Sequence, residues 1–261
     1  MVPIPLPVTV PDFTLHPPAP PAGHFDFGSA AIPVNTAGET KEQPLHLRVP
    51  DTHGGFPAGM FPAEHSMTRI GELRPLGQLH NSFIIAAGTD GLWIIDQHVA
   101  HERILFEQVL AQQAAGRAEV QHLLMPVILQ LTPEQQIEYA RIADELNNAG
   151  FETEPFGNRT IAVKAAPSVV GQGDLERVIF EILEIAENEL RSVSVSDLRR
   201  GIAASIACRA AIKINTPLDH RKMEWMLRTL AATDYPMACP HGRPVALQYS
   251  TRDILKSFHR I

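Results

Sequence analysis

Twelve consecutive residues, from 96 to 107, bring several potential metal ligands together. They read Asp-Gln-His-Val-Ala-His-Glu-Arg-Ile-Leu-Phe-Glu and follow Leu92–Ile95, an apolar run typical of a buried strand. Asp96 stands where a helix N-cap is expected, so His98 and Glu102 would share one face of the helix that follows. An imidazole and a carboxylate one helical turn apart make half of a zinc or manganese site.

A second segment, Cys-Pro-His-Gly-Arg-Pro at residues 239–244, supplies further ligand types. Its prolines and its glycine exclude a regular helix and favour a tight turn, which can direct the Cys239 thiolate and the His241 imidazole the same way. With His98 and Glu102 they form a ligand set that zinc accepts. In a simpler alternative, Asp-Gln-His is only a helix cap and a solvated turn. A closed four-ligand site could also hold a structural zinc without catalysis.

Two further residues have more ordinary alternatives. Glu107 lies five residues beyond Glu102 and leaves the helix face of His98, which favours a salt bridge or a contact to a ligand over direct ligation. Cys208 lies in an alanine-rich run, where a small buried core residue is more common than a ligand. The chain's two cysteines, Cys208 and Cys239, could pair but imply no disulfide framework.

Basic side chains in these segments leave two interpretations open. Arg209 and Arg243 can neutralise phosphates, or they can pair with Asp96 or with the glutamates. His101 and His122 are predicted to face solvent. The formal net charge of −7 predicts weak unaided binding to duplex DNA.

Composition separates the chain into two parts. Residues 1–70 hold 13 of the 22 prolines and lack apolar periodicity, which predicts a disordered linker. Residues 71–261 are richer in aliphatic side chains and long enough for one core, or for one core with a small satellite. No targeting segment or membrane-spanning run is visible, so we expect a cytoplasmic protein without a membrane partner.

Periodicity and turn signals predict an α+β fold. Strands are expected at 76–87, 92–95, 123–131, 151–155, 160–165 and 245–249. Helices are expected at 99–115, 133–150, 174–191, 196–212, 218–232 and from about 251 onward. Thr89-Asp90-Gly91 and Gly157-Asn158 mark hairpin turns. The expected helix caps are Thr132, Ser196 or Asp197, and Ser250 or Thr251.

Three motifs together carry a resemblance to the C-terminal half of MutL, a family of bacterial DNA mismatch repair proteins, in its endonuclease-bearing form. The family's metal motif is Asp-Gln-His-Ala, two residues, Glu, four residues, Glu. It is matched by Asp96, Gln97, His98, Val99 in place of Ala, Glu102 and Glu107. The family's Ala-Cys-Arg element is matched at 207–209, and its Cys-Pro-His-Gly-Arg-Pro element at 239–244 without change. Gln-His-Leu-Leu-Met-Pro at 121–126 is similar to the family's sliding-clamp-binding segment.

The resemblance implies roles for individual residues. Catalytic roles fall on Asp96, His98 and Glu102. The implied metal ligands are His98, Glu102, Cys239 and His241, with Asp96 and Cys208 close by. Contacts to these ligands or to phosphates fall on Glu107, Arg209 and Arg243. The implied clamp-binding residues are Gln121, Leu123, Leu124, Met125 and Pro126, although the apolar ones would be core in a plain edge strand.

Cofactors and partners follow from the same resemblance. It implies a structural or regulatory zinc, and a manganese or magnesium ion that assists nicking of one strand of duplex DNA. The implied partners are a second copy of the chain, the replication sliding clamp, the mismatch-recognition protein MutS through the full-length assembly, and duplex DNA, which implies association with the nucleoid. The family's ATPase half is expected outside this chain, as in a fragment or a split gene, because no Gly-rich phosphate loop or other nucleotide-binding residue is visible.

The domain organisation implied by the resemblance is two-lobed. Residues 71–118 and 191–261 are expected to form a dimerisation lobe that carries the metal site, and 119–190 an inserted, smaller regulatory lobe. The leading functional hypothesis is a latent metal-dependent nicking endonuclease of mismatch repair. The alternative is a non-catalytic dimerisation and matchmaker module with a structural zinc only. A third hypothesis is a metal-binding regulator without a DNA role.

Overall fold

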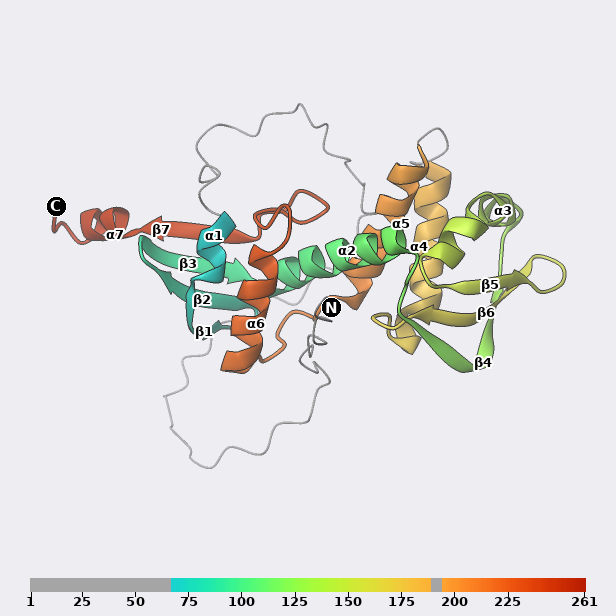
Figure 1. The fold of residues 1–261 in the computed structure, drawn as a ribbon, viewed down its shortest axis with the longest axis horizontal. Coiled ribbons are helices and arrows are strands. Elements are labelled where there is room, and N and C mark those ends of the chain that lie inside the picture. Colours follow the sequence, from blue (N-terminus) through green and yellow to red (C-terminus); the bar gives the residue numbers. More distant parts are fainter. Residues whose placement is uncertain (1–66, 189–193) are drawn as a thin grey trace, which may run out of the picture. The chain divides into compact units, whose positions relative to one another are not determined.

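The computed structural model describes residues 67–188 and 194–261 (Figure 1). These residues form helices and two antiparallel sheets, which confirms the α+β class. The predicted linker lies outside the described residues up to position 66, but its last four positions are helical, because α1 spans Met67–Gly71 and buries Ile70. Among the described residues, no helix is long and apolar enough to cross a membrane.

The first sheet has the strand order β1-β2-β3-β7. Its strands are β1 (Arg74–Leu79), β2 (Phe83–Gly88), β3 (Gly91–Asp96) and β7 (Ala246–Ser250). The last strand lies far along the chain and pairs with β3, so that Ile94 lies opposite Leu247. The prediction of one strand at 76–87 is wrong. The chain reverses there through His80 and Asn81, both in the left-handed region at φ 49° and 47° without a glycine to signal the turn.

The predicted hairpin at Thr89-Asp90-Gly91 is confirmed. Gly88 pairs with Gly91, so the loop has two residues. Gly91 has φ 150°, and a Cβ at this position would lie 2.1 Å from the backbone oxygen of Tyr249. Only glycine fits this close approach of two strands.

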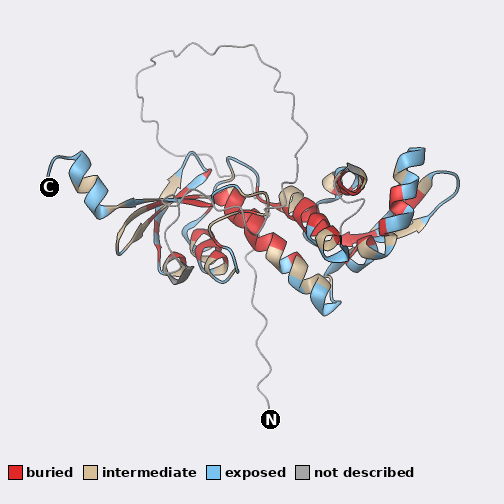
Figure 2. Cartoon of the chain, turned by 90° about the horizontal axis from the view of Figure 1, so that it is seen from above, coloured by how far each residue is buried: buried red, intermediate tan, exposed pale blue. Residues whose placement is uncertain are grey.

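Helix α2 (Gln97–Ala115) follows β3 without a break and ends at Gly116, which is left-handed at φ 60°. It packs against α5 (Val195–Ala210) and α6 (His220–Ala231). Nearly every residue in its first half is consequently buried, whereas its end is exposed (Figure 2). The predicted solvent exposure of His101 is therefore wrong, because a helix covered on several sides has no single polar face.

The second sheet has the order β4-β6-β5. Its strands are β4 (Val120–Gln130), β5 (Glu152–Pro155) and β6 (Thr160–Pro167). The helices α3 (Pro133–Asn148) and α4 (Leu175–Asn188) accompany it, with a short 3-10 turn, η2 (Gln172–Asp174). The Thr132 cap is confirmed as a full capping box with Gln135. The hairpin around Gly157-Asn158 is confirmed by the antiparallel pairing of β5 with β6.

Both ends of α5 differ from the prediction. Ser194 caps α5, and neither predicted cap does; Asp197 instead gives its N–H to the Ser194 hydroxyl. The alanine-rich helix ends at Ala210 because Ala211 is extended. The cap of α7 (Thr251–Ser257) is Ser250, one of the two predicted residues.

One core joins the helices around the second sheet. Side chains of α2, α3, α4, α5 and β6 belong to a single cluster of buried apolar residues that runs from Leu105 to Ala211. The apolar side of α4 is buried throughout, as its spacing predicts. Because this core includes α2 and α5 as well as the elements between them, the division at 118/119 and 190/191 stays a prediction.

Candidate metal centre

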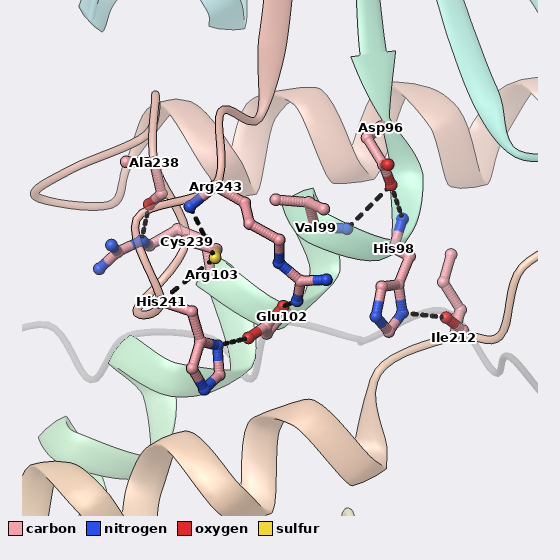
Figure 3. Close-up of polar contacts among 10 residues, drawn as sticks. All are labelled: Asp96, His98, Val99, Glu102, Arg103, Ile212, Ala238, Cys239, His241 and Arg243. Atoms are coloured by element: carbon pink, nitrogen blue, oxygen red, sulfur yellow. Dashed lines mark hydrogen bonds and ion pairs between the residues drawn. The ribbon is translucent and has the colours of Figure 1, made fainter. Parts of the chain in front are cut away.

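Three of the four predicted ligands meet in the fold. One potential ligand atom each of Glu102, Cys239 and His241 lies within 4.8 Å of the other two (Figure 3). Glu102 comes from α2 and is 0% exposed, and Cys239 is 2% exposed. Carboxylate, thiolate and imidazole are the three ligand types that zinc uses in proteins, so the donor set fits this ion.

The Cys-Pro-His-Gly-Arg segment forms the predicted tight turn. The N–H of Cys239 donates to the carbonyl oxygen of Arg243 at 2.9 Å, and the N–H of Gly242 donates to the carbonyl oxygen of Cys239 at 2.9 Å. Gly242 has φ 80°, which explains a glycine there. The Cys239 Sγ accepts the N–H groups of His241 at 3.3 Å and Arg243 at 3.4 Å. Burial raises the pKa of Cys239, but hydrogen bonds from His241 and Arg243 bring it below its ordinary value.

Glu102 is the electrostatic centre of the cluster. Its Oε1 lies 2.5 Å from Nδ1 of His241, and its Oε2 lies 2.6 Å from Nη2 of Arg243. Burial raises the pKa of Glu102, yet the hydrogen bond and charge of His241 and the charge of Arg243 lower it overall. Burial lowers the pKa of His241, whereas bonds to Cys239 and Glu102 raise it to about 9. A metal ion that binds here would therefore displace a proton from His241.

His98, the fourth predicted ligand, is outside this group of three. Its Nδ1 lies 2.8 Å from the carbonyl oxygen of Ile212. A carbonyl only accepts, so Nδ1 carries a proton, and Nε2 is the ring atom left for a metal. In Figure 3 the Arg243 guanidinium lies beside Glu102 on the side facing His98.

Asp96 caps α2, as predicted. Its Oδ1 accepts the N–H groups of His98 at 2.9 Å and Val99 at 3.0 Å. Arg243 pairs with Glu102, not with Asp96, which decides between the partners considered for it. The structure does not bring Asp96 into the three-ligand group, and its role as a ligand stays a prediction.

The remaining predicted site residues also lie outside the group of three. Glu107 forms a salt bridge with Arg103, in which Nη1 and Oε1 are 3.4 Å apart. Arg209 pairs with Glu181 at 2.7 Å. Cys208 is a free, half-buried thiol, and burial together with the charge of Glu102 raises its pKa to about 11. The salt bridge of Glu107 matches its more ordinary alternative, whereas Arg209 pairs with a glutamate outside the predicted site.

The model of one protein family, the MutL C terminal dimerisation domain, matches residues 76–218, more than half of the chain. The chain belongs to this family. It is 67% identical over 253 residues to the DNA mismatch repair protein MutL of Solibacter usitatus, covering 97% of this chain and 38% of that protein. It is 50% identical over 239 residues to that of Koribacter versatilis, covering 92% and 35%.

A third MutL protein, from Symbiobacterium thermophilum, is 40% identical over 194 residues, covering 73% of this chain and 31% of that protein. The chain thus spans about a third of the length of these relatives, between 31% and 38%. The match to the family model includes the Asp96–Glu107 and Ala207–Arg209 motifs and stops before the ligand turn at 239–244. We therefore include that turn in the candidate metal centre because Cys239 and His241 lie beside Glu102.

The segment 121–126, which is predicted to bind the sliding clamp, lies on β4, at the edge of its sheet. His122 pairs with Ala165, and the next pair is Val127 with Val163, so β4 bulges between them. His122 is exposed, as predicted. Within the bulge Leu124 is 99% and Met125 77% exposed, whereas Leu123 packs against the core. The core alternative is therefore wrong for Leu124 and Met125. Gln121 is half-buried and donates to the Val170 carbonyl.

Two buried polar residues near the site, Gln97 and Arg103, were given no role from the sequence. Gln97 is fully buried and donates to the carbonyl oxygens of Asn81 at 2.5 Å and Thr216 at 2.9 Å. Arg103 is buried and donates to the carbonyl oxygen of Ala238 at 2.5 Å. The spacing of Arg103 and Glu107, four residues on one helix, was the available signal for their pairing.

Proposed function

We propose that this chain is the dimerising, metal-dependent DNA-nicking part of a cytoplasmic, nucleoid-associated mismatch repair protein. The observation that carries this proposal is the buried group of Glu102, Cys239 and His241, which the fold assembles from distant parts of a MutL-family chain. Nicking one strand of duplex DNA is the activity that we assign to this site. The relatives are named as DNA mismatch repair proteins, and the chain corresponds to about a third of them.

The chain's own residues define the proposed metal sites. Glu102, Cys239 and His241 would hold zinc, with the free Nε2 of His98 as the fourth donor. Asp96 offers a hard carboxylate oxygen for a manganese or magnesium ion. When bound, such ions supply Lewis-acid stabilisation of the charge that develops on a phosphodiester under attack.

Arg243 has two roles in this proposal. Its guanidinium neutralises Glu102 in the metal-free site, while 46% of its side chain remains exposed. An ion that takes over the charge of Glu102 would leave this guanidinium available for a phosphate oxygen. Arg209 has no such freedom, because Glu181 already binds it.

An apolar sheet face supports homodimerisation. Leu79 and Phe83 form one cross-strand pair on the first sheet, and Leu247 and Tyr249 lie on β7. Their side chains are between 37% and 50% exposed. An uncovered apolar face of this kind marks an interaction site, and a second copy presents the same face for two-fold pairing.

The exposed bulge of β4 supports the sliding clamp as a partner. Leu124 and Met125 offer large apolar side chains to solvent on an edge strand, which suits recognition as a short extended peptide. With a net charge of −7, the chain depends on such a partner, on MutS and on an ATPase half to reach DNA.

One observation favours the alternative of a structural zinc without catalysis. Both oxygens of Glu102 have protein partners, and Glu102 and Cys239 are almost completely buried. Structural zinc sites are closed in this way, whereas catalytic sites keep an open position. The dimerisation and matchmaker module is therefore the second candidate.

Nicking of supercoiled plasmid in manganese, with the sliding clamp added, tests the two candidates. The unmodified chain is compared with Asp96→Asn, which keeps a helix-capping side chain, and with Glu102→Gln. The matched control is Glu184→Gln, an exposed carboxylate on α4. We expect both site variants, still folded and dimeric, to lose nicking and the control to keep it. If the unmodified chain does not nick even with clamp and ATPase half supplied, the structural-zinc module is the better account.

A further inference from the structure

Arg103 and Glu107 lie on the turn of α2 that follows Glu102, and neither belongs to the three-ligand group. Both side chains bind the backbone of the loop 234–238, which leads directly into the ligand turn. We propose that this pair positions Cys239 and His241 for metal by fixing that loop against α2. The inference rests on the proposed metal centre.

Glu107 fixes the start of the loop. Its Oε2 accepts the N–H of Asp234 at 2.7 Å, and its Oε1 accepts the N–H of Tyr235 at 3.3 Å. A carboxylate that receives two successive backbone N–H groups forms charge-assisted hydrogen bonds, which are stronger than bonds between neutral groups. The loop is thereby anchored at one end.

Arg103 fixes the end of the loop. Its Nε donates to the carbonyl oxygen of Ala238 at 2.5 Å, and Nη1 faces Glu107 at 3.4 Å. The guanidinium carbon also lies 5.4 Å from the ring centroid of Phe106 and 6.0 Å from that of Tyr235. Only the planar, forked group of arginine combines these contacts, so lysine is not an equivalent.

The anchored loop continues into the ligand turn without an intervening residue. Ala238 precedes Cys239, and Met237 accepts the N–H of Val245 at 2.9 Å on the far side of the turn. The carbonyl oxygen of Val245 in turn accepts the N–H of Asp96 at 2.9 Å. The segment that carries the turn is thus tied to α2 through Ala238 and to the end of β3 through Val245.

Loss of this anchor has a specific expected consequence. The hydrogen bonds within the ligand turn do not involve Arg103 or Glu107, so the turn keeps its own shape without them. What changes is its alignment with Glu102, which α2 carries independently. Metal affinity should therefore fall more than the stability of the metal-free protein.

The test uses the whole chain and two metal probes. Zinc affinity is measured by competition with a chelator, and cobalt(II) absorption reports the geometry around the Cys239 thiolate. The variants are Glu107→Ala, Glu107→Gln and Arg103→Lys. The control is Glu224→Ala, which removes the acid of another i,i+4 pair, with Arg228 on α6 at 3.6 Å. Thermal unfolding in chelator checks that each variant folds.

We expect Glu107→Ala and Arg103→Lys to bind zinc about 10- to 100-fold more weakly, with a changed cobalt spectrum, and the control to bind normally. Glu107→Gln keeps one acceptor oxygen, so it should lose less zinc affinity than Glu107→Ala. If Glu107→Ala does not fold, Glu107→Gln is the variant that tests the positioning role. Equal zinc affinity and identical spectra in the variants and the unmodified chain would overturn the positioning role. An unmodified chain that binds neither metal would instead overturn the metal centre itself.

Discussion

His98 and His101, three residues apart on α2, bind the two backbone polar groups of one residue, Ile212. Nδ1 of His98 lies 2.8 Å from the Ile212 carbonyl oxygen, and Nδ1 of His101 accepts the Ile212 N–H at 3.0 Å. The first ring must therefore be protonated at Nδ1 and the second must not. Two histidines three residues apart thus hold opposite protonation states at the same ring atom, because one meets the backbone acceptor and the other the backbone donor of the same residue.

The buried His101 predicts a pH dependence of stability. Burial, with a smaller contribution from the charge of His98, lowers the pKa of His101 from 6.5 to about 4. Between these values the unfolded chain binds a proton that the folded chain refuses, so stability is complete above pH 6.5 and falls as the pH drops toward 4. His101 alone should lower the free energy of unfolding by on the order of 3 kcal/mol as the pH falls from 6.5 to about 4.

Urea unfolding at several pH values from 7.5 to about 4.5 measures this effect, with the range set by the ordinary histidine pKa. His101→Asn is the matched variant, because its amide oxygen can accept the Ile212 N–H without titrating. The unmodified chain should lose stability more steeply than the variant as the pH falls. Parallel curves would show that His101 does not supply the difference.

The two cysteines should differ in their effect on zinc. Cys239→Ala removes a thiolate from the three-ligand group, so we expect zinc to stabilise this variant no longer. Cys208→Ala removes a thiol outside the group and should leave the zinc effect intact. At a free zinc concentration 100 times the dissociation constant, the unmodified chain should gain about 2.7 kcal/mol.

Thermal melts with added zinc and with excess chelator give this comparison directly. A normal response to zinc in Cys239→Ala would remove the ligand turn from the site. A lost response in Cys208→Ala would bring Cys208 back as a ligand.

The apolar sheet face predicts a variant that separates the dimer. Leu247→Asp places a charge at a half-exposed apolar position opposite Ile94. Burying that charge between two copies would cost several kcal/mol, so the chain should become monomeric at micromolar concentration. Light scattering after size exclusion gives the mass. Leu124→Asp, on the other sheet, is the control that should remain dimeric. If Leu247→Asp is also dimeric, the interface lies elsewhere.

The exposed β4 bulge predicts a variant of this chain that binds the sliding clamp more weakly. Leu124→Ala together with Met125→Ala removes the two most exposed apolar side chains of the segment. We expect affinity for the sliding clamp to fall at least tenfold, because anchor residues of this kind carry most of the energy of such contacts. Calorimetric titration of clamp with chain measures it. Unchanged affinity, with the bulge otherwise intact, would place the clamp contact on another surface.

Local signals in the sequence predicted much of the site. Asp96 ends a strand and caps a helix, and that single corner places Glu102 on the helix turn that meets Cys239 and His241. The prolines and glycine of the ligand turn fixed its tight geometry. The caps at Thr132 and Ser250 followed from the same kind of local hydrogen bonding.

What the sequence did not predict depends on tertiary contacts or on weak turn signals. His101 is buried because α5 and α6 cover α2. Arg103 is buried because its guanidinium binds the backbone of a loop that is distant in the sequence. Neither fact is visible in the spacing of the helix itself. The turn at His80 and Asn81 contains no glycine. Asn adopts left-handed backbone angles more often than most residues, but it also adopts other conformations, so its presence does not by itself mark a turn.

The corner at Asp96 has a geometric consequence for an assembly. Asp96 is both the last residue of β3 and the cap of α2, so no flexible residue separates the sheet from the helix that carries Glu102. Two copies joined through the outer face of this sheet would therefore carry their metal centres at one fixed separation. The distance between the two positions on a duplex that such a pair can reach would then be a constant of the protein, independent of the DNA sequence beneath it.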